Sequence, residues 1–236
     1  TSPVCGTLEY PSGTVAVDHA VLVCSDANGC RTSASDTSGK FCLPVENAGE
    51  YIFHVINETK GSKHYPEIYF PVNVLLADIA AQNRTEVGKV VVVPTAKSLQ
   101  LVDVKKGGAH DLGSGVSLTI GPEIGKKPPL DPNLTIGAAP LKKGQINART
   151  GTHYKGSGKL HMAVAFHPLE ATFTMPVPFK FPALGIAKGA SVEVFFLSEK
   201  DGKMTKAADG QESGGSIVSA AGQGLKNLGI LLVYSR

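Results

Sequence analysis

The chain has 236 residues, enough for one large domain or two small ones. Its net charge of +3 and its dispersed basic pairs exclude the clustered positive patch that nucleic-acid binding requires. No apolar run approaches the roughly 18 residues that span a bilayer, so we expect no transmembrane segment. The 27 glycines and 15 prolines exceed an average share of roughly 12 percent and favour many short strands joined by turns.

All four cysteines lie near the start of the chain: Cys5, Cys24, Cys30 and Cys42. An even number in one small region indicates disulfides and an oxidising compartment, so we predict a secreted or cell-surface protein. No C-x-x-C occurs, which leaves a zinc ribbon, a thioredoxin-like site and c-type haem attachment without support. The start, Thr1-Ser2-Pro3, has no signal-peptide pattern and is typical of a mature end.

Residues 1–95 predict a first domain of short antiparallel strands. Asp26-Ala27-Asn28-Gly29 and Asp36-Thr37-Ser38-Gly39 are turn signals, because Asn and Gly tolerate positive φ. Ala77–Gln82 is either one helical turn or a loop. The expected strands are Val4–Tyr10, Ala20–Ser25, Cys30–Ser35, Lys40–Val45, Tyr51–Asn57, Ile68–Leu76 and Val87–Pro94.

Four segments of this first domain have a characteristic order and spacing: Val4–Leu8, Ala20–Val23, Ser35–Phe41 and Ala48–Val55. The most specific part is a D-x-x-G-K-F turn that is followed by a G-x-Y strand. Together they resemble the carboxypeptidase regulatory-like domain, a transthyretin-like sandwich of seven strands found in secreted and cell-surface proteins. Members of that family carry no catalytic residues of their own, so the resemblance implies a non-enzymatic module.

The resemblance also implies a disulfide pairing. In transthyretin-like sandwiches the first and fourth strands are neighbours in one sheet, and the second and third are neighbours in the other. Alternation places Cys5, Cys24 and Cys42 on outward strand faces. The family arrangement therefore implies the pairs Cys5–Cys42 and Cys24–Cys30, the second of them across a hairpin.

Residues 96–236 predict a second β-sandwich domain around Ala171–Leu197. Apolar side chains occupy alternate positions from Ala171 to Phe181, and Ser191–Leu197 follows a turn, so we expect a core hairpin. Residues 107–115 and most of 121–140 predict loops. Gly229–Tyr234 has almost no polar face and is expected to be covered on both sides. The remaining expected strands are Ser98–Val104, Val116–Ile120, Leu134–Ile136, Leu160–Phe166 and Ser216–Ala220.

Thr172–Pro182 followed by Gly185–Val194 resembles the β-sandwich shared by zonula occludens proteins, netrin receptors and ankyrins. In bacterial surface proteins a similar domain often follows a transthyretin-like one. Some members of this group cleave themselves at a His-Phe-Ser turn. Here the nearest text is Ala165-Phe166-His167-Pro168, which reverses the order and lacks the nucleophile, so we expect no self-cleavage.

The motifs of catalysis and cofactor binding are missing from the sequence. No G-x-S-x-G or phosphate-binding glycine loop occurs, and we predict no catalytic or cofactor-binding residues and no cofactor. His161 and His167 share a strand face, but ~3.3 Å per residue separates them by roughly 20 Å, too far to share a metal ion. We therefore predict no metal site; Asp26, Asp36 and Asp111 are the loop carboxylates to test for Ca²⁺.

Two further groups of residues leave alternatives open. Three sequons, at Asn57, Asn83 and Asn133, permit N-glycosylation if the source is eukaryotic. The aromatic residues Tyr65, Tyr69 and Phe70 form either a small binding platform or part of the core.

The sequence thus favours a non-enzymatic, extracellular structural or interaction protein built of two β-sandwiches. Its expected partner is protein, with self-association through exposed strand edges into a filament or matrix. The alternative is a binding module of an extracellular enzyme, for carbohydrate, peptide or calcium. A hydrolase of unrecognised type is a third hypothesis.

Overall fold

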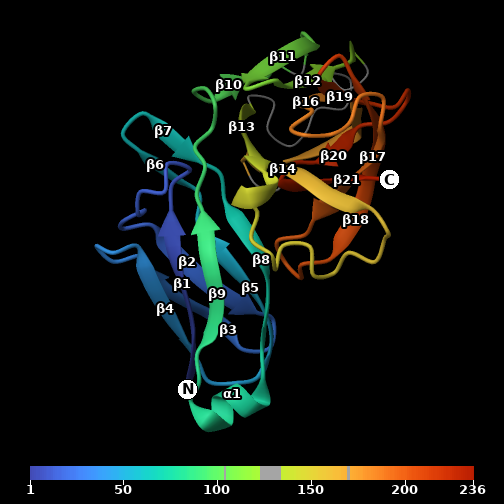
Figure 1. The fold of residues 1–236 in the computed structure, drawn as a ribbon. Coiled ribbons are helices and arrows are strands. Elements are labelled where there is room, and N and C mark those ends of the chain that lie inside the picture. The colour runs from blue at the N-terminus through green and yellow to red at the C-terminus, as the bar shows by residue number, and fades with distance from the viewer. Residues whose placement is uncertain (104, 123–133, 169–170) are drawn as a thin grey trace.

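The computed structural model describes residues 1–103, 105–122, 134–168 and 171–236. Within these ranges the regular elements are strands and two short helices, so the predicted all-β class is confirmed. Figure 1 shows two β-rich regions, here called the first unit (β1 to β9) and the second unit (β10 to β21). Among the described residues, no helix has both the length and the apolar character needed to cross a membrane.

The strands of the first unit follow the turn signals of the sequence. Each predicted strand occurs within a few residues of its expected ends, and the segment left open as helix or loop is the helix α1. The short hairpin β6–β7 is an addition. The elements are β1 (Ser2–Glu9), β2 (Ala20–Ser25), β3 (Gly29–Ala34), β4 (Lys40–Val45), β5 (Gly49–Val55), β6 (Glu58–Lys60), β7 (Lys63–Tyr65), β8 (Ile68–Val74), α1 (Leu76–Ala81) and β9 (Thr85–Val91).

Two layers make up the first unit, one of order β4-β1-β9 and one of order β3-β2-β5-β8. The first strand lies beside the fourth and the second beside the third, which is the arrangement that the family resemblance implies. The expected antiparallel pairing is wrong at one place, because β1 and β9 run parallel. Parallel neighbours need a long crossover connection, and the chain supplies one by passing through the other layer and α1 before it returns as β9.

Aromatic side chains fill the space between these two layers. Phe41 of β4 stacks on Phe53 of β5 at a centroid distance of 5.0 Å, and Phe53 lies 5.1 Å from Phe70 of β8. All three side chains are buried. These three rings, one each from β4, β5 and β8, therefore form the centre of the first unit's core.

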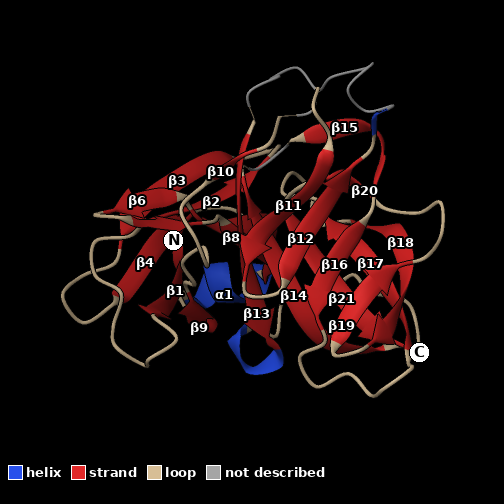
Figure 2. Ribbon diagram, turned by 90° about the horizontal axis from the view of Figure 1, so that it is seen from above, coloured by secondary structure: helices blue, strands red, loops and turns tan. Residues whose placement is uncertain are grey.

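The second unit is one long sheet of order β10-β13-β14-β21-β17-β18-β19-β16-β12-β11, with the pair β15–β20 beside it. Strands from both ends of the order contribute to one core, including Ile136 of β13 and Leu118 of β12, so the sheet curls over itself (Figure 2). The elements are β10 (Gln100–Leu101), β11 (Gly108–Gly113), β12 (Val116–Ile120), β13 (Thr135–Lys142), the 3₁₀ helix η1 (Lys143–Gln145), β14 (Lys159–His167), β15 (Thr172–Val177), β16 (Phe179–Pro182), β17 (Ser191–Leu197), β18 (Met204–Ser213), β19 (Ser216–Ser219), β20 (Leu225–Asn227) and β21 (Ile230–Ser235).

The core of the first unit continues into the second. Ala163, Ala165 and Leu232 belong to the same buried cluster as the aromatic residues of the first unit. Ala163 and Ala165 of β14 are therefore covered by the first unit. The strand β21 lies between β14 and β17 and is buried on both faces, so the prediction that it is covered on both sides is confirmed.

Tyr69 of β8 provides a polar link inside this apolar junction. Its hydroxyl donates a hydrogen bond to the carbonyl of Leu197 and accepts one from the N–H of Ile230, each at 2.8 Å. All three groups are buried. Removing the Tyr69 hydroxyl would therefore leave the Leu197 carbonyl and the Ile230 N–H without a partner, and water cannot replace it.

The predicted hairpin Ala171–Leu197 is wrong. The chain breaks at Pro178, so that β15 pairs with β20, whereas β16 pairs with β12 and β19. The strand β17 pairs with β18 and β21 instead of β16. Proline at 176 and 178 removes two backbone donors, which favours a change of sheet at this place. Met175, expected in the core, is 39% exposed.

Three other expectations for the second unit need correction. Residues 107–115, expected as a loop, contain the strand β11, which pairs with β12 although it has no apolar alternation. The expected strand Ser98–Val104 is reduced to the two residues of β10, and residue 104 lies outside the described residues. The short strand Leu134–Ile136 is the start of the longer β13, whose Pro140 and alanines gave no period-2 signal.

Candidate functional site

One side of the first unit presents two edge strands, β3 and β4, one from each layer. Along β3 every side chain except Ser33 is exposed. An edge strand has unpaired N–H and C=O groups that can accept a strand from another chain. This side, β3 together with β4, is here called the open edge.

Disulfides join both strands of the open edge to their inner neighbours. Cys42 of β4 is bonded to Cys5 of β1, and Cys30 of β3 is bonded to Cys24 of β2. These are the pairs that the family resemblance implies, with Cα separations of 4.2 and 4.1 Å. Each bridge holds an edge strand in an extended conformation against its sheet.

The register shows which backbone groups of β3 point outward. Ser35 donates its N–H to the carbonyl of His19 at 3.0 Å, so this pair is hydrogen-bonded. Bonded and non-bonded pairs alternate along an antiparallel ladder, and the short Cα separation at Cys30 fits a non-bonded pair. The N–H and C=O groups of Cys30, Thr32 and Ala34 therefore point away from β2, toward the open edge.

The adjoining edge strand β4 offers fewer outward backbone donors to another strand than β3 does. The N–H of Leu8 donates to the carbonyl of Gly39 at 2.8 Å, so the same alternation turns the backbone of Lys40, Cys42 and Pro44 outward. Proline has no N–H, and the outward row of β4 is interrupted at Pro44. The strand β3 has no proline.

Side chains of the second unit cover the opposite edge strand, β9. Asn147 donates from its amide nitrogen to the carbonyls of Val87 at 2.8 Å and Lys89 at 3.0 Å. Arg149 donates to the carbonyl of Glu86 at 2.6 Å. These side chains occupy acceptors that a further strand would need.

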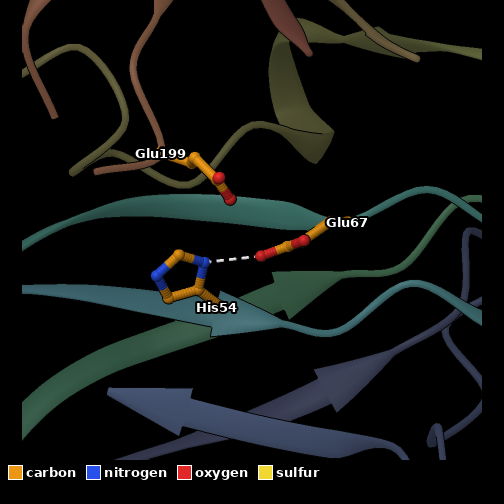
Figure 3. Close-up of side chains that lie close together, drawn as sticks. All are labelled: His54, Glu67 and Glu199. Atoms are coloured by element: carbon orange, nitrogen blue, oxygen red, sulfur yellow. Dashed lines mark hydrogen bonds and ion pairs between the residues drawn. The ribbon is translucent and has the colours of Figure 1, made fainter. Parts of the chain in front are cut away.

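A cluster of metal-ligating side chains lies where the two units meet. It consists of His54 from β5, Glu67 just before β8, and Glu199 from the turn between β17 and β18. Figure 3 shows the three side chains converging, and their ligand atoms all lie within 4.8 Å of one another. The Nδ1 of His54 and the Oε1 of Glu67 share a hydrogen bond of 2.6 Å.

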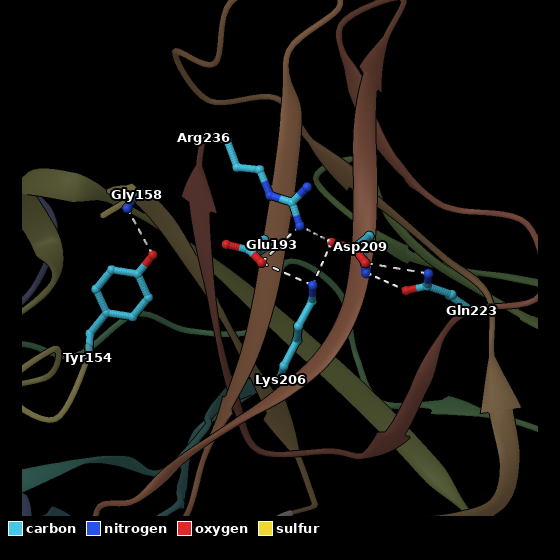
Figure 4. Close-up of polar contacts among 7 residues, drawn as sticks. All are labelled: Tyr154, Gly158, Glu193, Lys206, Asp209, Gln223 and Arg236. Atoms are coloured by element: carbon cyan, nitrogen blue, oxygen red, sulfur yellow. Dashed lines mark hydrogen bonds and ion pairs between the residues drawn. The ribbon is translucent and has the colours of Figure 1, made fainter. Parts of the chain in front are cut away.

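An aromatic groove of about 650 Å³ is lined by Glu50 of the first unit and by residues of the second unit. Tyr154 stacks on Tyr234 at 3.7 Å and meets Phe195 edge-on at 5.4 Å. The hydroxyl of Tyr154 accepts a hydrogen bond from the N–H of Gly158 at 3.0 Å (Figure 4). Burial raises the pKa of Tyr234 to about 12, so that phenol stays neutral at physiological pH.

His153 closes one end of the groove. Its Nε2 lies 3.0 Å from the carboxylate of Glu50 in the first unit, and its Nδ1 lies 3.0 Å from the carbonyl of Gly202. His153 therefore links Glu50 of the first unit to the β17–β18 turn of the second unit through both ring nitrogens.

A ring of charges lies on the outer surface of β17 and β18 (Figure 4). Lys206 and Arg236 each contact both Glu193 and Asp209, at 2.8 to 3.0 Å. Hydrogen bonds from Arg236 and Lys206 hold the pKa of Glu193 below its usual range. The two positive and two negative charges of this ring sum to zero.

The predicted glycosylation sites lie in different surroundings. The side chain of Asn57 is half-buried, and its amide nitrogen lies 3.1 Å from the Nδ1 of His167 in the second unit. Asn83 is exposed between α1 and β9. Asn133 lies outside the described residues.

The structure keeps apart the carboxylates that the sequence singled out for calcium. Asp26 lies in the β2–β3 turn, Asp36 in the β3–β4 turn and Asp111 in β11. The carboxylate of Asp36 accepts hydrogen bonds from Ser38 and from the N–H of Lys40, which lower its pKa. Asp111 is paired with Lys97 at 2.6 Å.

The remaining candidates are structural. Tyr65, Tyr69 and Phe70 are buried in the first unit, which decides between core and platform in favour of the core. His161 and His167 lie along one strand, β14, as expected. The groove and the His54 cluster escaped the sequence analysis, because their residues come from distant segments and carry no local motif.

Sequence comparisons with known families and curated proteins give no match for this chain. A search of solved structures finds a streptococcal ancillary pilin with 10% sequence identity and a TM-score of 0.29. That match covers 99% of this chain and 53% of the pilin, so the chain spans about half the pilin's length.

Proposed function

We propose that this chain is a non-enzymatic extracellular structural or interaction protein that binds other protein chains by strand addition at β3. The supporting observation is the open edge itself, in which an outward row of backbone groups lies on a strand that a disulfide fixes to its sheet. A rigid edge loses little conformational entropy when another strand pairs with it. The disulfides also favour an oxidising, extracellular location.

Self-association is the form of this function that we favour. A second copy can offer its own β3, and an antiparallel pair of identical edges gives a closed dimer. An extended filament needs a second, different surface on each copy. The finer assignments, namely a filament subunit, the two family resemblances, two domains divided at residue 95 and glycosylation at Asn57, Asn83 and Asn133, remain parts of this proposal.

The substitution Thr32→Pro tests the proposal. It removes the outward N–H at the centre of β3 and leaves the bonded positions Arg31 and Ser33 intact. Sedimentation analysis and negative-stain electron microscopy of unreduced protein should show assemblies for the wild type and dispersed chains for this variant.

Thr32→Ala is the matched control, because it changes the same side chain and keeps the backbone donor. Assemblies of unchanged size in Thr32→Pro, or dispersed wild-type protein at every concentration, would argue against strand addition at β3.

A binding module is the second candidate function, and the aromatic groove is the observation that favours it. Tyr154, Phe195 and Met204 give the groove an apolar wall, and Glu50 and His153 supply polar groups at its end. Concave apolar surfaces with a few polar groups are typical of small-ligand sites. Screening of oligosaccharides and peptides by NMR should shift resonances of Tyr154 and Phe195 if this candidate is correct, and leave them unchanged if it is not.

A further inference from the structure

The His54 cluster joins three segments that are distant in the sequence. His54 and Glu67 belong to the first unit, and Glu199 reaches them from the β17–β18 turn of the second unit (Figure 3). The side chains of His54 and Glu67 are only 9% and 13% exposed. His54 and Glu67 are therefore largely shielded from solvent, and Glu199 is half-buried.

The charges of this cluster favour a cation. The cluster brings two carboxylates to a single imidazole, so one nitrogen and two oxygen atoms are placed together that can each coordinate a cation. Removing carboxylates from water is costly unless positive charge compensates them. A divalent ion in place of the proton between His54 and Glu67 would compensate both carboxylates at once.

The ligand types indicate which ion fits. One imidazole nitrogen with two carboxylate oxygens is a donor set suited to Zn²⁺ and related transition metals, whereas Ca²⁺ takes six to eight oxygen ligands. Ligands of one tetrahedral zinc ion lie roughly 2.0 to 2.2 Å from it and so roughly 3.4 Å from one another. Atoms up to 4.8 Å apart in the cluster must therefore move closer together, and the His54–Glu67 pair, now 2.6 Å apart, must separate to admit the ion. Glu199 lies on a turn, where a small side-chain movement achieves this.

We propose that His54, Glu67 and Glu199 bind a divalent transition-metal ion, Zn²⁺ in the first place, which joins the two units. Three protein ligands leave a further coordination position for water. Because the ligands come from both units, binding would stabilise their packing and add to the junction that Tyr69 already holds.

Calorimetric titration of the chelator-treated full chain with ZnCl₂ tests the proposal. We expect one ion per chain and a rise in the unfolding temperature on adding Zn²⁺. Glu199→Gln should weaken binding at least tenfold and abolish the temperature rise. Glu193→Gln is the matched control, because it neutralises a carboxylate at the other end of the adjacent β17, and it should bind Zn²⁺ like the wild type.

Histidine side-chain NMR gives a readout that does not depend on a variant. Zn²⁺ should shift the ring resonances of His54 and leave those of His153 and His161 unchanged. The absence of saturable binding at millimolar ZnCl₂ would overturn the proposal. So would binding that Glu199→Gln leaves intact, or resonance shifts confined to the other histidines.

Discussion

The two sides of the first unit manage their strand edges in opposite ways. On one side, side chains of the second unit bond to the carbonyls of β9 and occupy them. On the other side, no hydrogen bond from the described part of the second unit reaches the backbone of β3 or β4, and each is bonded to its inner neighbour by a disulfide. Both solutions keep an edge strand in place, but the second leaves the outward backbone groups of β3 clear of the second unit. The carbonyls of Cys30 and Ala34 accept local hydrogen bonds, from the side chains of Arg31 at 3.3 Å and Ser33 at 3.5 Å.

Under the proposed strand addition, this difference would separate the internal contacts of the chain from its external ones. The covered side belongs to a continuous core that includes Ala163, Leu232 and Tyr69. A protein that only needed to be stable could have covered both edges. Covering one and cross-linking the other is the arrangement expected of a subunit with a binding edge.

Removing the disulfides of the open edge should lower the unfolding free energy more than any other change considered below. The Cys5–Cys42 bridge spans 37 residues and the Cys24–Cys30 bridge spans 6. Loop entropy predicts losses of about 4 and about 2 kcal/mol in unfolding free energy when each pair is replaced by alanine. Denaturant unfolding measures both losses, and peptide mapping checks the pairing. Equal losses for the two bridges would contradict the loop argument.

Tyr69→Phe should have the next largest effect, on the covered side. It removes one hydroxyl and leaves the carbonyl of Leu197 and the N–H of Ile230 buried without this partner. We expect a loss on the order of 3 kcal/mol. Tyr10→Phe, at a half-buried hydroxyl that bonds to His19, is a comparison within the first unit and should cost less. Equal losses of unfolding free energy in the two variants would show that the hydrogen bonds of Tyr69 stabilise the protein no more than that of Tyr10.

Asn147→Ala should make part of the outward backbone of β9 available for pairing. It frees the carbonyls of Val87 and Lys89, and we expect a loss of about 1 to 2 kcal/mol. More important, the variant should form larger assemblies than the wild type, because a second edge becomes available. Asn147→Asp is the informative companion, since a carboxylate cannot donate to these carbonyls. Unchanged assembly in both variants would show that β9 is protected by other means.

Glu193→Gln should have the smallest effect, since its charge ring is partly exposed and involves no strand edge. We expect less than about 1 kcal/mol at pH 7. The pKa of Glu193 is depressed in the folded state, so its contribution is present above the unfolded value of about 4.3 and disappears as the pH falls through the folded value. Unfolding of wild type and variant across this pH range should therefore converge in acid.

The first unit was predictable because its signals are local. Turns at Asp26–Gly29 and Asp36–Gly39 and alternation in β2, β4 and β5 set the strands, and the resemblance implied their neighbours. The second unit was harder to predict. The continuous alternation through β15 and β16 predicts one strand, but the two segments belong to different sheets. The register of its long sheet depends on contacts between distant segments. The same reason hid the His54 cluster, whose ligands lie on three separate elements.

Residue-resolved amide exchange along β3, measured at low and high protein concentration, tests strand addition most directly. At low concentration the amides of Arg31 and Ser33 should be protected by β2, and those of Thr32 and Ala34 should exchange freely. At high concentration Thr32 and Ala34 should become protected as well, which gives a continuous row. If they exchange equally fast at both concentrations while the protein assembles, the open edge is not the binding surface.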